Sequence, residues 1–230
     1  MNFALIPARA GSKRIPHKNV KDFCGQPLIA YSIKAAQDSG LFDDIIVSTD
    51  SPEIAELAIS LGASAPFMRP KALADDFTGT REVIEHAINA LSEQGKHYDY
   101  CCCIYATAPL LSVEYLNKGF EILKANDEKS FAFSVTHFDF PVQRAMKMTE
   151  HGLAPMFPAF VDARSQDLEE ALHDAGQFYW GTTAGFLSKK AMFSSHAEAI
   201  LLPRHLVQDI DTEEDWIQAE LMYRAQKLAI

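Results

Sequence analysis

Four fixed positive charges lie near the start of the chain, directly after a short apolar run at residues 3–6. They are Arg9, Lys13, Arg14 and Lys18. Pro7 and Pro16 disfavour a continuous helix here, because proline lacks the backbone N–H and clashes with the preceding turn. The stretch is therefore predicted to be a loop at the end of a buried strand. Cations and backbone N–H groups in such a loop suit the oxygens of a triphosphate.

The candidate nucleotide-binding residues of this loop are Ala8, Arg9, Ala10, Gly11, Ser12, Lys13 and Asn19. Lys18 ends the loop, where its amine could reach a transferring phosphate. Asn19 is either a turn residue or a contact to the base or sugar. The loop is not the P-loop of ATPases, which needs a glycine directly before its lysine and Ser or Thr after it. The alternative interpretation is a solvated basic loop.

Two carboxylates near the end of the chain, Asp209 and Asp211, form the second candidate site. In an extended segment they project from the same side. Mg²⁺ binds few protein carboxylates and completes its shell with phosphate oxygens and water, so this pair suits it. The alternative is a helix start, in which Thr212 and Asp215 form a capping box and Asp211 merely precedes it.

Two further regions could contact a ligand. Arg69 could serve a nucleobase or phosphate, while Thr78 and Thr80 could bind ribose or cap the following helix. Aromatic residues between glycines at 173–181 suit one face of a sugar, although a core strand would explain them as well. The candidate sugar-binding residues there are Gln177, Phe178 and Tyr179, with Arg164 and Gln166 for a substrate carboxylate.

The charge distribution favours an anionic small molecule as substrate. The 230-residue chain has a formal net charge of -10, which argues against general binding of nucleic acid or anionic membranes. Residues 1–21 nevertheless contain lysines and arginines and no acid. The positive potential is thus concentrated in one place.

No apolar stretch reaches the length of a membrane span, and Arg9 interrupts the apolar start, so neither a membrane helix nor a signal peptide is expected. The cysteines are Cys24 and the run 101–103. Neighbours in a strand point to opposite faces, so the run is interpreted as buried packing rather than a disulfide or metal site. We expect a cytoplasmic protein.

Strands and helices alternate over the first 125 residues. Strands are expected at 3–6, 44–49 and 100–105, and helices at 27–36, 52–61, 113–123 and around the apolar positions Val83, Ile84, Ala87, Ile88 and Leu91. The alternation predicts an α/β fold with a mostly parallel sheet and helices on both faces. Because ligands bind outside the carboxyl ends of such strands, the basic loop and residues 105–109 should meet in one crevice.

The pattern changes after a strand at 131–136. The segment at about 137–175 is rich in Phe, Met and Pro, and is predicted to be an arm inserted into a single domain, 1–230. Its exposed apolar residues indicate a partner surface, which we expect to form a homodimer. Strand character is expected again at 178–187 and 200–202, and a final helix at 212–229.

Four stretches together resemble the cytidylyltransferases that activate nine-carbon and related α-keto acid sugars. They are Ile6-Pro7-Ala8-Arg9-Ala10-Gly11-Ser12-Lys13 with Lys18-Asn19, Arg69-Pro70 with Asp75/Asp76, Ala106-Thr107-Ala108-Pro109, and Asp209-Ile210-Asp211-Thr212. They occur in the family's order over nearly the whole chain. The resemblance implies a mixed, mostly parallel sheet of the nucleotide-diphospho-sugar transferase type, CTP as a substrate, and an arm that dimerises and reaches the neighbouring site.

The resemblance also implies roles for single residues. Arg9, Lys18 and Asp211 would be catalytic, and Mg²⁺ would lie at Asp209 and Asp211. Ala106 would join the nucleotide site and Tyr105 and Thr107 the sugar site. The sialate-activating branch usually reads Gln-Pro-Thr-Ser-Pro where this chain has Tyr105-Ala106-Thr107-Ala108-Pro109. The missing Gln argues against sialate, and the stretch is similar to the branch that acts on pseudaminate.

The expected reaction is transfer of CMP from CTP to the anomeric hydroxyl of pseudaminate, with release of pyrophosphate. Sialate, legionaminate and an eight-carbon keto acid (KDO) are the alternative acceptors. The alternative outside the enzymes is a protein of the same fold that binds a nucleotide without turnover. The intact basic loop and the pair Asp209 and Asp211 argue against it. No histidine stands out as a general base.

Overall fold

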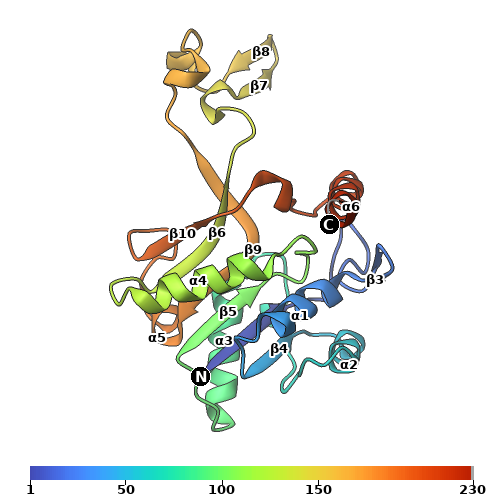
Figure 1. The fold of residues 1–230 in the computed structure, drawn as a ribbon. Coiled ribbons are helices and arrows are strands. Elements are labelled where there is room, and N and C mark those ends of the chain that lie inside the picture. Colours follow the sequence, from blue (N-terminus) through green and yellow to red (C-terminus); the bar gives the residue numbers. More distant parts are fainter. Residues whose placement is uncertain (229–230) are drawn as a thin grey trace.

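The computed structural model describes residues 1–228 and centres on a six-stranded sheet, with strand order β10-β6-β9-β5-β1-β4 (Figure 1). The strands are β1 (Asn2–Pro7), β4 (Asp44–Ser48), β5 (Tyr100–Ile104), β6 (Phe131–His137), β9 (Leu172–Thr182) and β10 (Ala197–Leu201). β9 runs antiparallel to both its neighbours, and the other pairs are parallel. The predicted mixed, mostly parallel α/β fold is confirmed.

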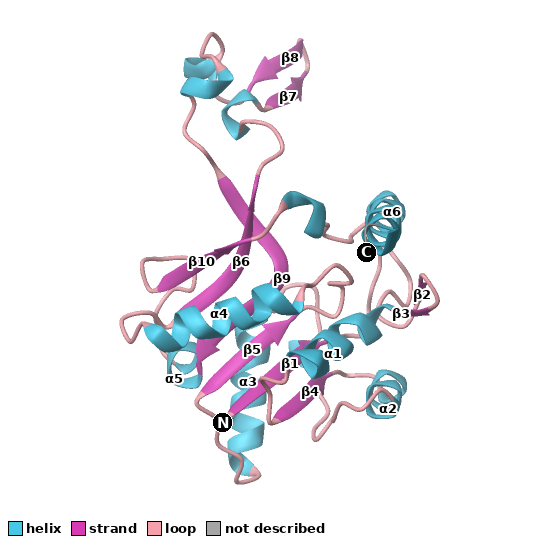
Figure 2. Ribbon diagram, viewed as in Figure 1, coloured by secondary structure: helices cyan, strands magenta, loops and turns pink. Residues whose placement is uncertain are grey.

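Helices cover both faces of this sheet (Figure 2). One face carries α1 (Leu28–Ser39), α2 (Pro52–Ser60) and α4 (Val113–Ala125), and the other α3 (Thr80–Glu93) and the short α5 (Thr183–Leu187). The five apolar positions expected in α3 are all buried. Cys102 packs on the first face while Cys101 and Cys103 pack on the second, as strand alternation predicts, and all three thiols are free.

A third, smaller core joins the two ends of the chain. The last helix, α6 (Glu213–Leu228), packs Trp216 and Ala219 against Ile15 and Phe23, next to the hairpin of β2 (Asp22–Phe23) and β3 (Gln26–Pro27). The Phe23 and Trp216 rings meet edge to face at 5.4 Å. This apolar contact holds the segment before α6 against the basic amino-terminal loop.

The structure corrects one of the expected elements. The strand expected at 178–187 begins at Leu172 and ends at Thr182, and 183–187 form α5 because the Thr182 hydroxyl accepts the Gly185 N–H at 2.9 Å. Ala229, the expected end of the last helix, lies outside the described residues.

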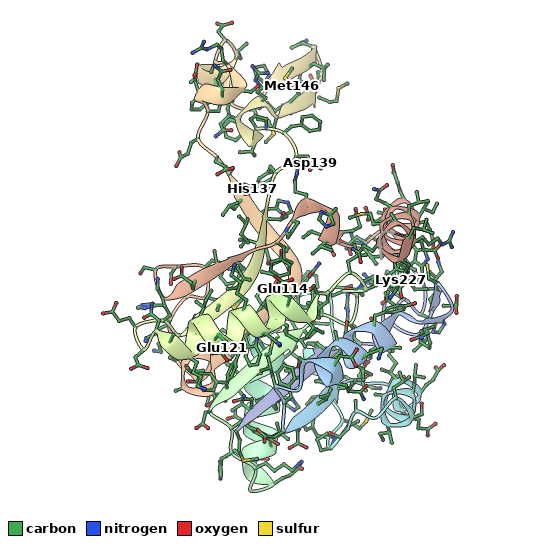
Figure 3. All side chains as sticks on the ribbon, viewed as in Figure 1. Glu114, Glu121, His137, Asp139, Met146 and Lys227 are labelled. Carbon is green, nitrogen blue, oxygen red and sulfur yellow. The ribbon has the colours of Figure 1, made fainter. Side chains whose placement is uncertain are left out.

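Residues 138–171 leave the sheet between β6 and β9 as a long arm (Figure 1). Its tip is the hairpin of β7 (Met146–Thr149) and β8 (Gly152–Pro155), and its other regular pieces are the single 3-10 turns Val142–Arg144, Pro158–Phe160 and Ser165–Asp167. Large apolar side chains are exposed on it, with Phe140 at 82%, Met148 at 77% and Leu153 at 68%. Figure 3 shows Met146 at this tip, far from the sheet. The dimer inferred from this arm stays a prediction.

Replacing Gly181 by alanine is expected to destabilise the fold by about 1–3 kcal/mol, the usual cost of overpacking a core. A Cβ at Gly181 would lie 2.5 Å from a Phe186 ring carbon and 2.9 Å from a Phe131 ring carbon, and both rings are buried. Urea unfolding measures the change, with Gly11→Ala as control because a Cβ there meets nothing within 4 Å. If Gly181→Ala and the wild-type protein unfold at the same urea concentration, the Phe186 and Phe131 rings can move to make room for the added methyl group.

Candidate active site

The basic loop, residues 8–21, leaves the carboxyl end of β1 and is tied to the end of β4. The Ala8 N–H donates to the Ser48 carbonyl at 2.9 Å, and the Ala10 N–H donates to the Asp50 carboxylate at 2.9 Å. Further on, His17 has a φ of 53°, in the left-handed region that non-glycine residues adopt seldom. The loop therefore has a defined path rather than that of a freely solvated segment.

Asn19 is a buried anchor of this loop. Its exposed fraction is 6%, its side-chain amide donates to the Arg9 carbonyl at 3.0 Å, and its own carbonyl accepts the Ile29 N–H at 3.0 Å. The side chain thus holds the start of the loop, and the backbone carbonyl holds the first turn of α1. Asn19 lies in a turn, which was one of the two interpretations of the sequence.

One cleft gathers most of the predicted site residues. Its lining includes Arg9, Ser12, Lys13, Lys18, Asn19, Arg69, Thr78, Thr80, Tyr105, Ala106, Thr107 and Asp211. Ala8 is buried beneath the loop, and Ala10 lines a small neighbouring cavity on the other side. Gly11 is exposed on the loop. Residues from the amino-terminal loop, the β5 end and the segment before α6 therefore converge at one edge of the sheet.

Asp211 faces the basic loop directly. Its carboxylate pairs with Arg14 at 2.8 Å and with the Lys18 ammonium at 3.4 Å. Lys18 also donates to the Ile210 carbonyl at 2.5 Å, and its side chain is only 18% exposed. The late acidic segment and the early cationic loop thus share one cleft.

Asp76 pairs with the two remaining cations of the loop. Its carboxylate contacts Arg9 at 2.7 Å and is also bonded to Lys13, while Arg9 donates to the Asp75 carbonyl at 2.8 Å. These hydrogen bonds, that of Lys13 first, lower the pKa of Asp76. Arg9, Lys13, Arg14 and Lys18 thus share two carboxylates of the same chain, those of Asp76 and Asp211.

Arg69 lies at the back of the cleft and is 6% exposed. Its Nε donates to the Ser48 hydroxyl at 3.1 Å, and a terminal nitrogen donates to the Ser48 carbonyl. Burial lowers the pKa of its guanidinium. The residue is held firmly by β4, and it lends the cleft a positive charge that solvent does not screen well.

Neither threonine of the Asp75–Thr80 region caps α3 through its side chain; the helix is preceded by Gly79 and lacks a side-chain cap bond. The Thr78 hydroxyl donates to the Asp75 carboxylate at 2.7 Å, which lowers the pKa of Asp75. The Thr80 and Tyr105 hydroxyls lie 2.8 Å apart. Capping, the alternative for both residues, is wrong, and both hydroxyls line the cleft.

The capping box expected at the start of α6 is present. The Asp215 carboxylate accepts the Thr212 N–H at 2.7 Å, and the Thr212 hydroxyl accepts the Asp215 N–H at 3.2 Å. Asp215 also accepts the Asp211 N–H at 3.0 Å. Capping therefore fixes the backbone at Asp211 and leaves its side chain free to face the cations.

Asp209 lines a second cavity that adjoins the cleft. Burial, and after it the charge of Asp211, raises the pKa of Asp209. Among residues 1–228 no group of three or more His, Cys, Asp or Glu side chains is placed to hold a metal ion. The two carboxylates still fit Mg²⁺, because that ion takes one or two of them and completes its shell with phosphate oxygens and water.

The candidate sugar-binding residues are dispersed. Tyr105 and Thr107 line the cleft. Gln177 is buried and donates to the Leu206 carbonyl. Phe178 is fully buried beside Trp180, so the core-strand alternative holds for both residues, and the assignment of Phe178 to the sugar is corrected. Tyr179 is 2% exposed.

Arg164 and Gln166 lie on the arm, away from the cleft of their own chain (Figure 1). The Arg164 guanidinium pairs with Asp167 at 2.7 Å. These two residues can serve a cleft only if it belongs to another copy of the chain.

The fold is a mixed α/β sheet, and a cleft lined by basic residues lies at the carboxyl end of its first strand. The structure is similar to that of a CMP:2-keto-3-deoxy-manno-octonic acid synthetase complexed with CTP, with a TM-score of 0.73, 14% identity and coverage of 98% of this chain and 99% of that one. It is also similar to a 4-diphosphocytidyl-2C-methyl-D-erythritol synthase from Anaerococcus prevotii, with a TM-score of 0.62. At such low sequence identity, these two similarities show a shared fold only.

The sequence relatives are closer. A sequence model of the family described as "Cytidylyltransferase" matches residues 3–152. A pseudaminic acid cytidylyltransferase from Campylobacter jejuni is 46% identical over 97% of this chain and 96% of its own length. A CMP-N,N'-diacetyllegionaminic acid synthase from Legionella pneumophila is 31% identical over 99% of this chain and 98% of its own. The chain belongs to the cytidylyltransferase family, and so is a nucleotidyltransferase.

Proposed function

We propose that this protein transfers CMP from CTP to the anomeric hydroxyl of pseudaminate and releases pyrophosphate. The observation that carries the proposal is the single cleft in which the four-cation loop faces Asp211. The acceptor is taken from the relative with 46% identity over almost the full length of both chains. Tyr105, which stands where sialate-activating relatives carry Gln, lines that cleft.

The residues of the cleft suit such a transfer. The anomeric hydroxyl oxygen forms a bond to the α-phosphorus and its proton passes to water, while the bond from that phosphorus to the pyrophosphate oxygen breaks. This chemistry needs positioning and charge neutralisation more than covalent help. Arg9 and Lys13 are placed to hold phosphate oxygens in exchange for Asp76, and Lys18 is placed to balance charge that builds up on the transferring group.

Mg²⁺ is part of the proposal, with Asp211 and Asp209 as its protein ligands. The bound ion would neutralise phosphate charge and lower the pKa of the attacking hydroxyl. Asp211 pairs with Arg14 and Lys18, so its carboxylate lies beside the cations that would hold the phosphates.

We also infer a homodimer formed through the arm and a cytoplasmic location. Exposed apolar residues at the tip of a hairpin support the first, because a two-stranded hairpin is marginal alone. The free cysteines support the second, because thiols persist in a reducing compartment. No helix within residues 1–228 has the length and apolar character needed to cross a membrane.

Asp76→Asn is expected to tighten CTP binding without metal by up to about fivefold, a gain limited by the small worth of exposed ion pairs. The carboxylate competes with phosphate for Arg9 and Lys13, and asparagine carries no charge to compete with. Titration calorimetry at low salt measures the affinity. Asp38→Asn is the control, because it removes an exposed carboxylate paired with Lys34 elsewhere. Weaker binding would mean that Asp76 orders the cations for phosphate.

The activity is tested by measuring pyrophosphate release from CTP and Mg²⁺ with a panel of acceptors: pseudaminate, legionaminate, sialate and KDO. The expected result is release with pseudaminate and a much lower kcat/KM with the others. Preference for another acid would replace the proposed acceptor while keeping the reaction. No release with any acceptor, despite CTP binding, would favour a nucleotide-binding protein without turnover.

A further inference from the structure

A second cavity opens at the root of the arm, beside the nucleotide cleft. Its volume is about 340 Å³, which falls within the range of small-molecule sites. Its lining is Thr136, His137, Asp139, His173, Asp174, Ala175, Arg204, Val207, Gln208 and Asp209. Figure 3 labels His137 and Asp139 where the arm leaves the sheet. Asp209 lies two residues before Asp211, so the cavity adjoins the place where CMP would be transferred.

An irregularity in β9 determines which side chain faces this cavity. On β6, Phe133 pairs with Tyr179 and Val135 pairs with Asp174, so two steps along β6 correspond to five along β9. Gly176 sits within the extra residues with a φ of 62°. In a regular strand residues five apart point to opposite faces. The bulge brings Asp174 and Tyr179 onto the same face, and bulges of this kind re-aim side chains near active sites.

The bulge creates a carboxylate that is held at both oxygens. The buried Tyr179 hydroxyl donates to Asp174 Oδ2 at 2.5 Å, and the Gly176 N–H donates to Asp174 Oδ1 at 2.9 Å. Burial raises the pKa of Tyr179 far above its usual range, so its hydroxyl keeps its proton. Asp174 itself is exposed toward the cavity that it lines. The buried Tyr179 hydroxyl therefore fixes the orientation of the exposed Asp174 carboxylate.

The same unit connects the two cavities. The Tyr179 ring lies 5.3 Å from the ring of Tyr105, and the Tyr105 hydroxyl is 2.8 Å from that of Thr80. Tyr105 and Thr80 line the nucleotide cleft, whereas Asp174 lines the second cavity. Tyr105 thus supplies an aromatic support for Tyr179.

The charges of the second cavity determine what it can bind. Three carboxylates line it. Asp209 is a proposed Mg²⁺ ligand, and Asp139 pairs with the arginine of the lining, Arg204, at 2.9 Å, which leaves the Asp174 carboxylate to face a ligand. Such a surface accepts hydrogen bonds and repels a carboxylate. It suits hydroxyl and amide N–H groups. The carboxylate of a sugar acid would instead lie toward the cationic cleft.

We propose that Asp174, positioned by Tyr179, is a specificity residue that accepts hydrogen bonds from the hydroxyl or amide N–H groups of the sugar acid. The inference rests on the proposed function, because it assigns the second cavity to the acceptor of that reaction. Asp174 touches the sugar, whereas Tyr179 acts through Asp174 as a positioning residue. Tyr179 was expected from the sequence to contact the sugar itself, which its burial opposes.

The test compares KM for the sugar with KM for CTP in two variants. Asp174→Ala should raise the sugar KM about tenfold or more, as expected for a lost hydrogen bond to a charged group. Tyr179→Phe should raise it about three- to tenfold, because Gly176 still holds one oxygen of Asp174. In both variants KM for CTP should stay within about twofold of the wild-type value, since the nucleotide cations are untouched. Asp174→Asn, which keeps one acceptor oxygen, should fall between wild type and alanine.

Tyr98→Phe is the matched control. Tyr98 is also buried and also donates its hydroxyl to a carboxylate, that of Asp44, but it lies before β5, at the end opposite the cleft. It should lower stability much as Tyr179→Phe does and leave both KM values unchanged. An unchanged sugar KM in Asp174→Ala, or an equal rise of both KM values, would overturn the inference. Lack of turnover in the wild-type protein would overturn the proposed function instead.

Discussion

Asp211→Ala should lower the rate of pyrophosphate release by about a thousandfold or more, because it removes the proposed Mg²⁺ ligand of the cleft and the ion-pair partner of two cations. The fold should survive, since the capping box of Thr212 and Asp215 sets the start of α6 without the Asp211 side chain. The rate is measured at saturating CTP and sugar over a series of Mg²⁺ concentrations, and the thermal midpoint reports the fold.

The same variant separates binding from catalysis. Removing Asp211 frees Arg14 and Lys18 from their ion pairs, so CTP without metal should bind Asp211→Ala at least as tightly as wild type. The control is Asp38→Ala, which removes an exposed carboxylate on α1 and should change neither property. Near-normal turnover of Asp211→Ala at saturating Mg²⁺ would remove the metal role. Loss of CTP binding would show that Asp211 shapes the loop instead.

Local patterns predicted most of the first 125 residues. In α3 the apolar spacing from Val83 to Leu91 identified each buried position, because one face of that helix packs on the sheet and the rest meets solvent. Strand alternation likewise placed Cys102 opposite its two neighbours. Such predictions succeed because the period of a helix or strand, and therefore which side chains share a face, can be read from residues close together in the sequence.

The pairings that build the site could not be found this way. Asp76 meets Lys13 and Arg9 across more than sixty positions, and Asp211 meets Lys18 across 193. Their proximity depends on the Ile15, Phe23 and Trp216 cluster and on the sheet order, which no local pattern encodes. The resemblance to the family named residues that the structure brings together in the cleft, but it gave no reason for Asp174.

The bulge in β9 shows a different limit. From the sequence, Asp174 and Tyr179 should face opposite ways, and Tyr179 was assigned to the sugar while Asp174 was not. Gly176 was the available signal, since glycine inside a strand often marks a bulge. The signal was weak, because the aromatic run after it reads equally well as regular strand.

If the proposed dimer places each arm at the partner's cleft, Arg164→Ala should abolish most of the activity, because Arg164 belongs to the arm and does not line the cleft of its own chain. Negative charges at the tip of the arm should also lower the activity, because they should prevent the two copies of the chain from associating. Met148 and Leu153 face each other in the tip hairpin and are both exposed, so aspartate at both positions should weaken the dimer by about a hundredfold or more. Sedimentation velocity measures the monomer–dimer equilibrium. The control is the double variant Ile217→Asp and Leu221→Asp on α6, which charges two exposed apolar residues outside the arm.

Mixing two inactive variants decides whether the arm acts on the other subunit. Arg164→Ala keeps a complete cleft but lacks the arm residue, and Asp211→Ala lacks the cleft residue but keeps the arm. If each arm serves its partner, random exchange gives half heterodimers with one complete site each, and about one quarter of wild-type activity returns. If Arg164 served its own cleft, no subunit in the mixture would have both residues and activity would stay lost. Adding the two tip aspartates to the Asp211→Ala chain should abolish the recovery, because it then requires the arm contact itself.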